Sequence, residues 1–218
     1  MQGIIIIIVG AVIVGSILYG FLAAQRRRDG LASLASQLGL AFQPEDDDAL
    51  ADRLDFLRKL DLGSNRYAYN RLSGHFRGHD VMGFDFHYKT GSGKSTQHHH
   101  FTVLTLELPR AFPELLITPE GFFSKIAQSL GYDDIDFESA EFSRAFCVRS
   151  RDRKFAYDVC HGQMMEYLLA RRDLAIEFDT TLLALAFDRR LDVAAYEPRL
   201  RQLVEIRELM PTYLFAAT

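Results

Sequence analysis

Residues 79–108 read HDVMGFDFHYKTGSGKSTQHHHFTVLTLEL, and this stretch decides the fold class. In residues 79–89, apolar side chains alternate with polar or small ones, which is the period-two pattern of a half-buried strand. The apolar members are Met82, Phe84, Phe86 and Tyr88. A polar loop at 90–95 leads to a second predicted strand at 97–108, and Pro109 ends it because proline cannot donate to a sheet ladder. The stretch therefore predicts a β-hairpin.

Strands and helices extend outward from this hairpin without regular alternation. Further strand-like segments lie at 40–42, 66–76, 115–118, 135–137 and 146–149, and a second hairpin is predicted from 174–178, Asp179-Thr180-Thr181 and 182–187. A tight turn at Arg77-Gly78 joins the 66–76 strand to the hairpin. Helical patterns lie at 29–38, 44–59, 121–130, 155–172 and from about Pro198 to Pro211.

This order of elements predicts an α+β fold with a mixed, mainly antiparallel sheet and flanking helices, because a doubly wound sheet would alternate strand and helix. The predicted soluble domain covers 44–218, with room for two lobes at 44–131 and 132–218. No internal repeat or low-complexity linker divides it.

The N-terminal residues 3–24 carry no charge and are dominated by Ile, Val and Leu. A bilayer core needs about 20 apolar residues in a helix, so this run predicts a transmembrane helix. A cleaved signal peptide is the alternative, with Ala23-Ala24 as its cleavage site. Its apolar core is usually about 7–15 residues and follows a positively charged segment, which this sequence lacks.

Arg26, Arg27 and Arg28 follow the apolar run directly and predict a basic membrane collar at the start of a juxtamembrane segment, 25–43. Because basic residues stay on the cytoplasmic side, the expected topology is single-pass, with the N-terminus outside and the body in the cytoplasm of the cell. A specific anionic-lipid site at these arginines is the alternative role. A stripe of small residues that includes Gly15 and Gly20 also permits self-association of the helix.

The histidines suggest one candidate metal site, because five of the seven lie between His79 and His100. A regular hairpin would place His87 opposite His98 and Asp85 opposite His100, with all four on one face of the sheet. Imidazoles and a carboxylate are suitable zinc ligands, but a plain polar outer face explains the same pattern. A register slip of one residue would also separate the set. We therefore predict no resident metal or other cofactor.

Two other motifs lack the spacing or the structural context that their chemistry requires. Residues 91–96, GSGKST, resemble a phosphate-binding loop, but Tyr88 stands where the first glycine is needed and a strand follows instead of a helix. We predict no nucleotide there. Cys160 and His161 are adjacent in a predicted helix, where their side chains diverge by about 100°, so they do not form a catalytic pair.

The composition limits the classes of partner that we expect the chain to bind. The net charge is −4 with both signs interspersed, which argues against nucleic acid, since such a partner usually needs a strongly basic face. Cys147 and Cys160 are too few for a disulfide framework; two buried free thiols or a single bridge both fit the count. The acidic Asp46-Asp47-Asp48 run suits a helix N-terminus without any ligand.

The stretch from Asp136 to Asp152, DFESAEFSRAFCVRSRD, resembles a signature of bacterial membrane-anchored proteins of unknown function. In that family the signature precedes a helix similar to residues 164–169 and a hairpin similar to residues 174–187. The resemblance covers about residues 135–190 and implies the architecture without implying a reaction. Within it, Glu141, Phe142 and Arg144 suit packing and salt bridges as well as a site.

Three functions remain open on sequence grounds. The first is a cytoplasm-facing binding or scaffolding module of a membrane-associated assembly, with lipid around the N-terminal helix and a protein partner or a second copy of the chain. The second is a membrane-tethered, metal-dependent hydrolase that uses Asp85, His87, His98 and His100. The third is a domain that binds lipid or a small ligand at the bilayer surface. The absence of a convincing catalytic set favours the first, so we do not predict an enzyme.

Overall fold

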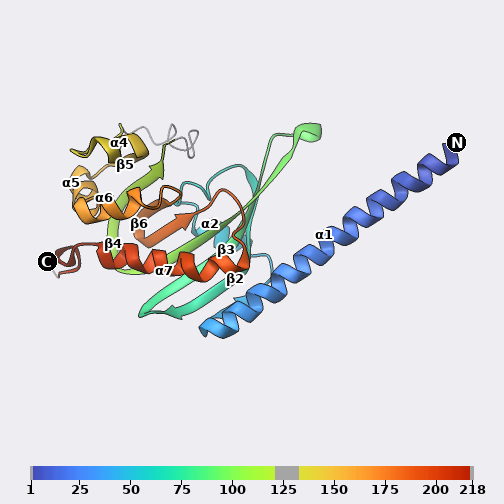
Figure 1. Ribbon diagram of the computed structural model, residues 1–218, viewed down its shortest axis with the longest axis horizontal. Coiled ribbons are helices and arrows are strands. Elements are labelled where there is room, and N and C mark those ends of the chain that lie inside the picture. The colour runs from blue at the N-terminus through green and yellow to red at the C-terminus, as the bar shows by residue number, and fades with distance from the viewer. Residues whose placement is uncertain (1, 121–132, 217–218) are drawn as a thin grey trace.

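The computed structural model describes residues 2–120 and 133–216, apart from the side chains of residues 2–9, 11 and 13. Within these residues, a 6-stranded antiparallel sheet is flanked by helices, which confirms the α+β prediction (Figure 1). The strands are β1 (Ala41–Gln43), β2 (Ser64–Phe76), β3 (His79–Thr90), β4 (Gln97–Pro119), β5 (Phe146–Ser150) and β6 (Ala175–Ala186). The helices are α1 (Gln2–Leu38), α2 (Asp48–Arg53), α4 (Ala140–Ala145), α5 (Arg153–Val159), α6 (Gly162–Leu169) and α7 (Val193–Leu209), with short 3-10 turns η1 (Gly93–Ser95) and η2 (Thr212–Phe215).

The long strand β4 pairs with three other strands of the sheet. Its first half pairs with β3, its last residues pair with β5, and β6 pairs along its other edge. The order β1-β2-β3-β4 comes from successive antiparallel neighbours. The turn between β2 and β3 is the predicted Arg77-Gly78, and both residues have positive φ (49° and 87°), as a two-residue hairpin turn of the primed type requires.

The two faces of the sheet bury separate cores. One face packs against α1, α7 and the α4–α6 helices, and its core includes Leu31, Leu104, Phe178 and Tyr196. The other face is covered by α2 and the turns that follow it, with Leu57, Phe84 and Phe101 in its core. Because both faces are covered, β3 is not the half-buried strand predicted from its alternation: Asp85 and His87, expected on a polar outer face, are both buried.

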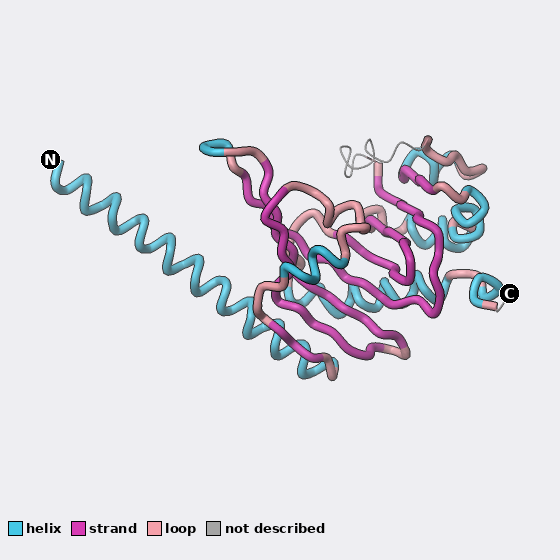
Figure 2. The backbone as a smooth tube through the Cα atoms, turned by 180° about the vertical axis from the view of Figure 1, so that it is seen from behind, coloured by secondary structure: helices cyan, strands magenta, loops and turns pink. Residues whose placement is uncertain are grey.

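Helix α1 is one continuous helix of 37 residues, about 55 Å long at 1.5 Å per residue. Gly39, with φ of 70°, ends it in the predicted C-terminal position. Its last part packs on the body, where Leu31 and Ala35 are buried, whereas its first part projects away from the body (Figures 1 and 2). Among the residues that the structure describes, no helix combines the length and the hydropathy needed to cross a membrane.

Several predicted elements are wrong in the β region. Residues 174–187 do not form a hairpin, because β6 continues through Asp179-Thr180-Thr181 and, among the described strands, pairs with β4 alone. Thr180, with φ of 51°, lies where the β4–β6 register shifts, and the extra residues there are on β4. Strand β4 also continues past Pro109 to Pro119, since Pro109 falls where the β4–β6 register shifts and needs no donor. Residues 135–137 form no strand; of the three, the Ile135 amide bonds to β5, at the Val148 carbonyl.

Three predicted helices differ from the observed ones in where they begin, end or break. The helix predicted at 155–172 is broken into α5 and α6 at Cys160 and His161, and the one predicted at 44–59 is reduced to the short α2. Helix α7 begins at Val193 and contains Pro198, earlier than the proline suggested. The helix predicted at 121–130 lies outside the described residues.

Candidate functional site

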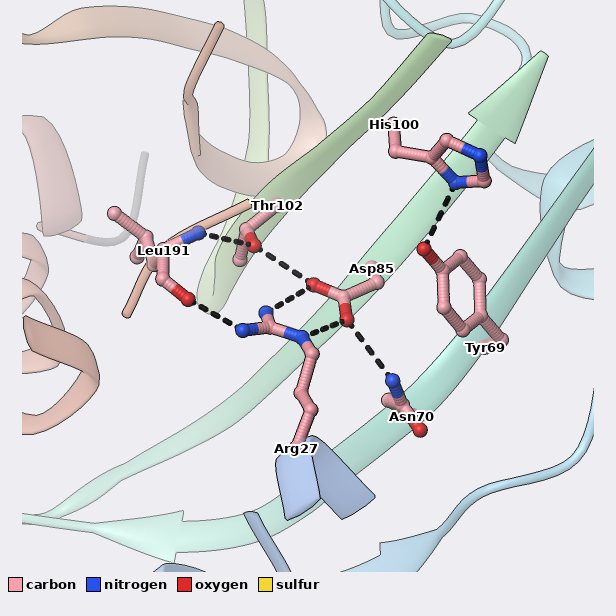
Figure 3. Close-up of polar contacts among 7 residues, drawn as sticks. All are labelled: Arg27, Tyr69, Asn70, Asp85, His100, Thr102 and Leu191. Atoms are coloured by element: carbon pink, nitrogen blue, oxygen red, sulfur yellow. Dashed lines mark hydrogen bonds and ion pairs between the residues drawn. The ribbon is translucent and has the colours of Figure 1, made fainter. Parts of the chain in front are cut away.

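A buried ionic cluster joins α1 to the centre of the sheet (Figure 3). The Asp85 side chain is fully buried, and the Arg27 guanidinium donates to both its oxygens, from Nε and Nη2, each at 2.7 Å. Asn70 Nδ2 donates to Asp85 Oδ2 at 3.0 Å, and Thr102 Oγ1 donates to Asp85 Oδ1 at 2.8 Å. Four donors therefore occupy the carboxylate, which has about four acceptor positions.

The cluster draws on distant parts of the chain. Asp85 and Thr102 are direct neighbours across the β3–β4 ladder. The segment between β6 and α7 closes the cluster: the Leu191 amide donates to Thr102 Oγ1 at 3.0 Å, and the Leu191 carbonyl accepts from Arg27 Nη1 at 2.6 Å. The contacts thus tie α1, three strands and the segment before α7 together.

A bulge in β2 brings Asn70 to the cluster. Tyr69 pairs with Asp85 and Leu72 with Gly83, so two residues of β2 oppose one residue of β3. Asn70 has φ of 52°, a left-handed conformation that asparagine tolerates better than most residues. Its Oδ1 atom has no hydrogen-bond partner in the described part of the chain. Asn70 is therefore held in place by its bond to Asp85 and by the bulge.

The electrostatics of the cluster favour a fixed ion pair. Burial disfavours the charge on Arg27, but the hydrogen bond and the negative charge of Asp85 outweigh it and raise the pKa of Arg27 above its ordinary value. Burial and the Asp85 charge together raise the pKa of Tyr69 to about 12. With its acceptor positions filled and its partner permanently charged, Asp85 suits a structural clamp better than an acid or base.

The predicted histidine face exists, but in another register. His87 pairs with His100 and Asp85 with Thr102, two residues away from the expected pairs. A shift of two keeps the side chains on the same face, so the grouping of the four candidates on one face is retained although the pairs are wrong. The position of the loop is the cause: the ladder closes at Thr90 and Gln97 and leaves 91–96 as the loop, one residue further along the chain than the predicted loop 90–95 of the same length.

The histidines bind each other and the neighbouring strand. His87 Nε2 lies 3.0 Å from His98 Nδ1, and His87 Nδ1 lies 3.0 Å from the Asn65 carbonyl. His100 Nδ1 lies 2.9 Å from the Tyr69 hydroxyl. Burial, then the charges of His87 and Arg190, lower the pKa of His100 to about 4, and burial also lowers the pKa of His87. These two rings are therefore neutral at pH 7.

The four metal candidates do not converge on one point. Asp85 turns to Arg27, whereas His87, His98 and His100 contact each other, Tyr69 and the Asn65 backbone. Across residues 2–120 and 133–216, no group of three or more His, Cys, Asp or Glu side chains is placed to hold a metal ion. The chemistry of this face is thus that of hydrogen-bonded imidazoles and tyrosines.

The three arginines of the predicted collar differ in exposure. Arg26 and Arg28 are exposed, but Arg27 enters the body, where its side chain is only 14% exposed. On a helix, residues one apart diverge by about 100°, which explains why Arg27 alone reaches Asp85. The Gly91–Thr96 stretch is a compact exposed tip containing η1 and leads into β4, not into an α-helix.

The two cysteines are free and buried. Burial raises the pKa of Cys147 to about 11 and that of Cys160 still further, so both stay protonated at neutral pH. Cys160 and His161 lie at the break between α5 and α6, where His161 Nε2 lies 2.9 Å from the Leu209 carbonyl. In the resembling stretch, Ser139 and Asp152 cap α4 and α5, and Glu141 pairs with Arg172 at the surface.

Sequence reasoning missed most of the cluster. It identified Asp85 as a metal candidate and Arg27 as a collar residue, but did not connect them, because 58 positions separate the two. Asn70 and Thr102 were not identified. One signal was available: asparagine is depleted in strands, so Asn65 and Asn70 within β2 indicate bulges, and both have positive φ.

The comparisons with known proteins concern the fold. No protein-family model matches the chain, and no curated protein matches it. Among solved structures, the crystal structure of the mycobacterial trehalose monomycolate transport factor A, TtfA, is similar, with a TM-score of 0.61 and 18% sequence identity. The match covers 86% of this chain and 96% of that chain. At this identity, the likeness shows a shared fold.

Proposed function

We propose that this chain is a membrane-anchored binding module, with its body in the cytoplasm, that serves a membrane-associated transport assembly. The observation that carries the proposal is the contrast along α1. Its outer part exposes seven large apolar side chains, and its inner part is fixed to the sheet by the Arg27–Asp85 pair.

The outer part of α1 exposes large apolar side chains around more than half of its circumference. Its exposed hydrophobic residues are Val12, Val14, Ile17, Leu18, Tyr19, Phe21 and Leu22, with Tyr19 75% exposed. Seven such residues within eleven positions cannot lie on one stripe of a helix with 3.6 residues per turn. An exposed apolar surface of this kind marks a membrane or protein contact. With the uncharged residues before it, it forms the 3–24 run, for which we propose a membrane span.

The cluster explains how a body would sit on such an anchor. Arg27 follows the end of the apolar run by three residues, about 4.5 Å of helix. No flexible linker separates the two, since α1 is continuous from Gln2 to Leu38. The body would therefore lie directly against the bilayer. Arg26 and Arg28, both exposed, suit the cytoplasmic side, where basic flanks are retained.

The transport context comes from the similar fold. TtfA is described as a trehalose monomycolate transport factor, and its fold matches most of this chain. A role in binding agrees with the polar groups of this chain. The acceptor positions of Asp85 are filled by hydrogen bonds, and the cysteines are buried and protonated. A groove of about 650 Å³ beside the start of α7 offers a surface of mixed polarity for a protein partner, with Arg189, Arg190 and Asp188 among its walls.

Membership of the bacterial membrane-anchored family remains a proposal that rests on residues 135–190. The metal-dependent hydrolase is disfavoured because Asp85 is occupied by Arg27. Lipid binding at the bilayer surface is taken up below as a property of the same module.

Fractionation of cells that make the full chain tests the anchor. We expect the chain to remain with membranes in alkaline carbonate, which strips peripheral proteins. A chain with Ile17, Leu18 and Phe21 all replaced by Lys should be released, whereas the same three replacements by Ala should leave it in the membrane, because alanine tolerates the bilayer. Release of the unaltered chain would contradict the anchor.

Fusions after Thr218 test the orientation. A fluorescent protein that matures in the cytoplasm should fluoresce, and alkaline phosphatase, which needs an oxidising compartment, should stay inactive. Strong phosphatase activity would place the body outside. Purification of the full chain in mild detergent should then recover membrane proteins of a transport assembly; recovery of the chain alone from crosslinked cells would count against the partner.

A further inference from the structure

We infer that the end of the β3–β4 hairpin, residues 89–100, is a second membrane contact that binds anionic lipid headgroups. The inference rests on the anchor proposed above and adds a surface that the anchor alone does not require. It follows from where the Arg27–Asp85 pair holds the hairpin relative to α1, and from the charge of the hairpin.

The hairpin and the outer part of α1 leave the body on the same side (Figures 1 and 2). The Arg27–Asp85 pair joins α1 to β3. From Asp85, β3 continues for five residues to Thr90, about 17 Å at 3.3 Å per residue. Along α1, the level of Ala24 lies only three residues, about 4.5 Å, from Arg27. The hairpin diverges from α1, so its reach along the helix is shorter than its own length (Figure 1). When α1 enters a bilayer near Ala24, the hairpin end reaches the level of the headgroups.

The charge of this hairpin end differs from that of the chain. Residues 89–100 contain Lys89 and Lys94 and no Asp or Glu, in a chain whose net charge is −4. Exposed Arg26, Arg28 and Arg190 add cations on the same side of the body, since Arg190 acts on Tyr69 and His100. Basic residues next to a membrane span are attracted by anionic headgroups.

The hairpin end is also built to keep its shape. Tyr88 stacks on His99, with ring centroids 4.5 Å apart, and His99 Nε2 lies 2.8 Å from Thr90 Oγ1. At the tip, the hydroxyls of Ser95 and Thr96 donate to the carbonyls of Ser92 and Gly93. The tip thus satisfies its own backbone while Ser92 and Lys94 stay exposed. A fixed polar tip of this kind suits headgroups and not the hydrocarbon core.

A depth measurement on the full chain tests the contact. Ser92→Cys, labelled with a polarity-sensitive fluorophore, is reconstituted in nanodiscs of phosphatidylcholine with or without phosphatidylglycerol, and a headgroup-linked quencher is added to the lipid. The native Cys147 and Cys160 are buried, so the introduced thiol is labelled selectively. A label at Glu138→Cys, exposed beside α4 at the far end of the body, is the matched control.

We expect strong quenching at position 92 in discs with phosphatidylglycerol, and none at position 138. Lys89→Gln with Lys94→Gln should reduce the quenching by about half or more, because two cations near the surface are lost. Lys154→Gln, which removes an exposed lysine elsewhere, should not change it. Equal quenching in neutral and anionic discs would overturn headgroup recognition. An unquenched probe on a chain that resists carbonate overturns this inference alone, whereas a chain that carbonate releases overturns the anchor as well.

Discussion

Asp85 and Glu177 are both buried carboxylates in the same sheet, but they lie on opposite faces and have different neighbours. On the face covered by α1 and α7, Asp85 receives hydrogen bonds from Arg27, Asn70 and Thr102. On the face covered by α2 and the turns after it, Glu177 lies among apolar neighbours and accepts the Arg58 amide at 2.9 Å.

Buried ionisable groups therefore have different surroundings on the two faces of the sheet. Burial raises the pKa of Glu177 to about 8, and it lowers the pKa of Lys59, on the same face, to about 7. Both groups are driven toward their neutral forms. On the Asp85 face, the carboxylate is paired with the Arg27 guanidinium and accepts hydrogen bonds from Asn70 and Thr102. The difference indicates that the first face is fixed by an ion pair and the second is sensitive to pH.

The largest expected effect comes from breaking the ion pair. Asp85→Ala leaves the Arg27 guanidinium without its counter-charge and removes the partner of Asn70 and Thr102. Loss of one member of a buried pair typically costs about 3–5 kcal/mol of unfolding free energy. Denaturant titration of the full chain in detergent measures it. Glu141→Ala, which breaks the exposed pair with Arg172, should cost less than about 1 kcal/mol. Equal losses in both variants would remove the distinction between the faces.

The second prediction concerns pH on the Glu177 face. A carboxyl with a raised folded-state pKa binds a proton that the unfolded chain has released, so stability falls as pH rises from about 4.5 toward 8. Lys59 has a lowered pKa of about 7 and loses stability as pH falls toward 7, so below pH 7 its contribution changes little. The interval from pH 5 to 7 thus isolates Glu177 from Lys59.

Glu177→Gln should remove this dependence and keep an oxygen to accept the Arg58 amide. Relative to the variant, the unaltered chain should lose about 2 kcal/mol of unfolding free energy between pH 5 and pH 7. Taking the difference between the two chains cancels the histidines, which titrate in both. Glu166→Gln on the exposed side of α6 is the control and should give parallel curves. Parallel curves for Glu177→Gln would mean that Glu177 is ionised in the fold.

A smaller effect is expected from the packing beside the ion pair. A Cβ added at Gly83 would lie 2.7 Å from Leu104 Cδ2 and 2.8 Å from Tyr196 Cε1. Overpacking of a core costs about 1–3 kcal/mol, and the lower part of that range applies because both neighbours are side-chain atoms that can shift. Gly162→Ala, where a Cβ meets nothing within 4 Å, is the control. A Gly83→Ala chain as stable as the control would show that Tyr196 is loosely packed.

The same contrast shows what the sequence could and could not predict. Alternation placed Phe84, Phe86 and the histidines on their correct faces, because side-chain direction in a strand depends only on parity. The hairpin register depended on the residue at which the connection begins, and the sequence did not determine that residue. Asp179-Thr180-Thr181 has turn composition, but the same residues also suit a continuous strand at a register shift.

The ion pair was beyond sequence reasoning for a different reason. Arg27 lies among three consecutive arginines, and only the phase of α1 decides which of them reaches the sheet. Asp85 looked like a member of a polar outer face, since nothing local indicated that α1 and α7 would cover it. Contacts between segments far apart in the chain depend on tertiary packing, which a single sequence does not display.

The smallest expected effect concerns the exposed loop beyond both faces. Lys94 lies in the hairpin tip and is exposed, so Lys94→Ala should change the unfolding free energy by less than about 0.5 kcal/mol. The tip leads into a strand and offers no helix N-terminus for phosphates, so isothermal calorimetry with ATP or GTP should show no binding. Lys94 belongs to neither core. Its replacement should therefore weaken the contact with lipid headgroups without changing the packing on either face of the sheet. A large loss of stability in Lys94→Ala, or saturable nucleotide binding that this variant abolishes, would contradict the assignment of the tip to the surface.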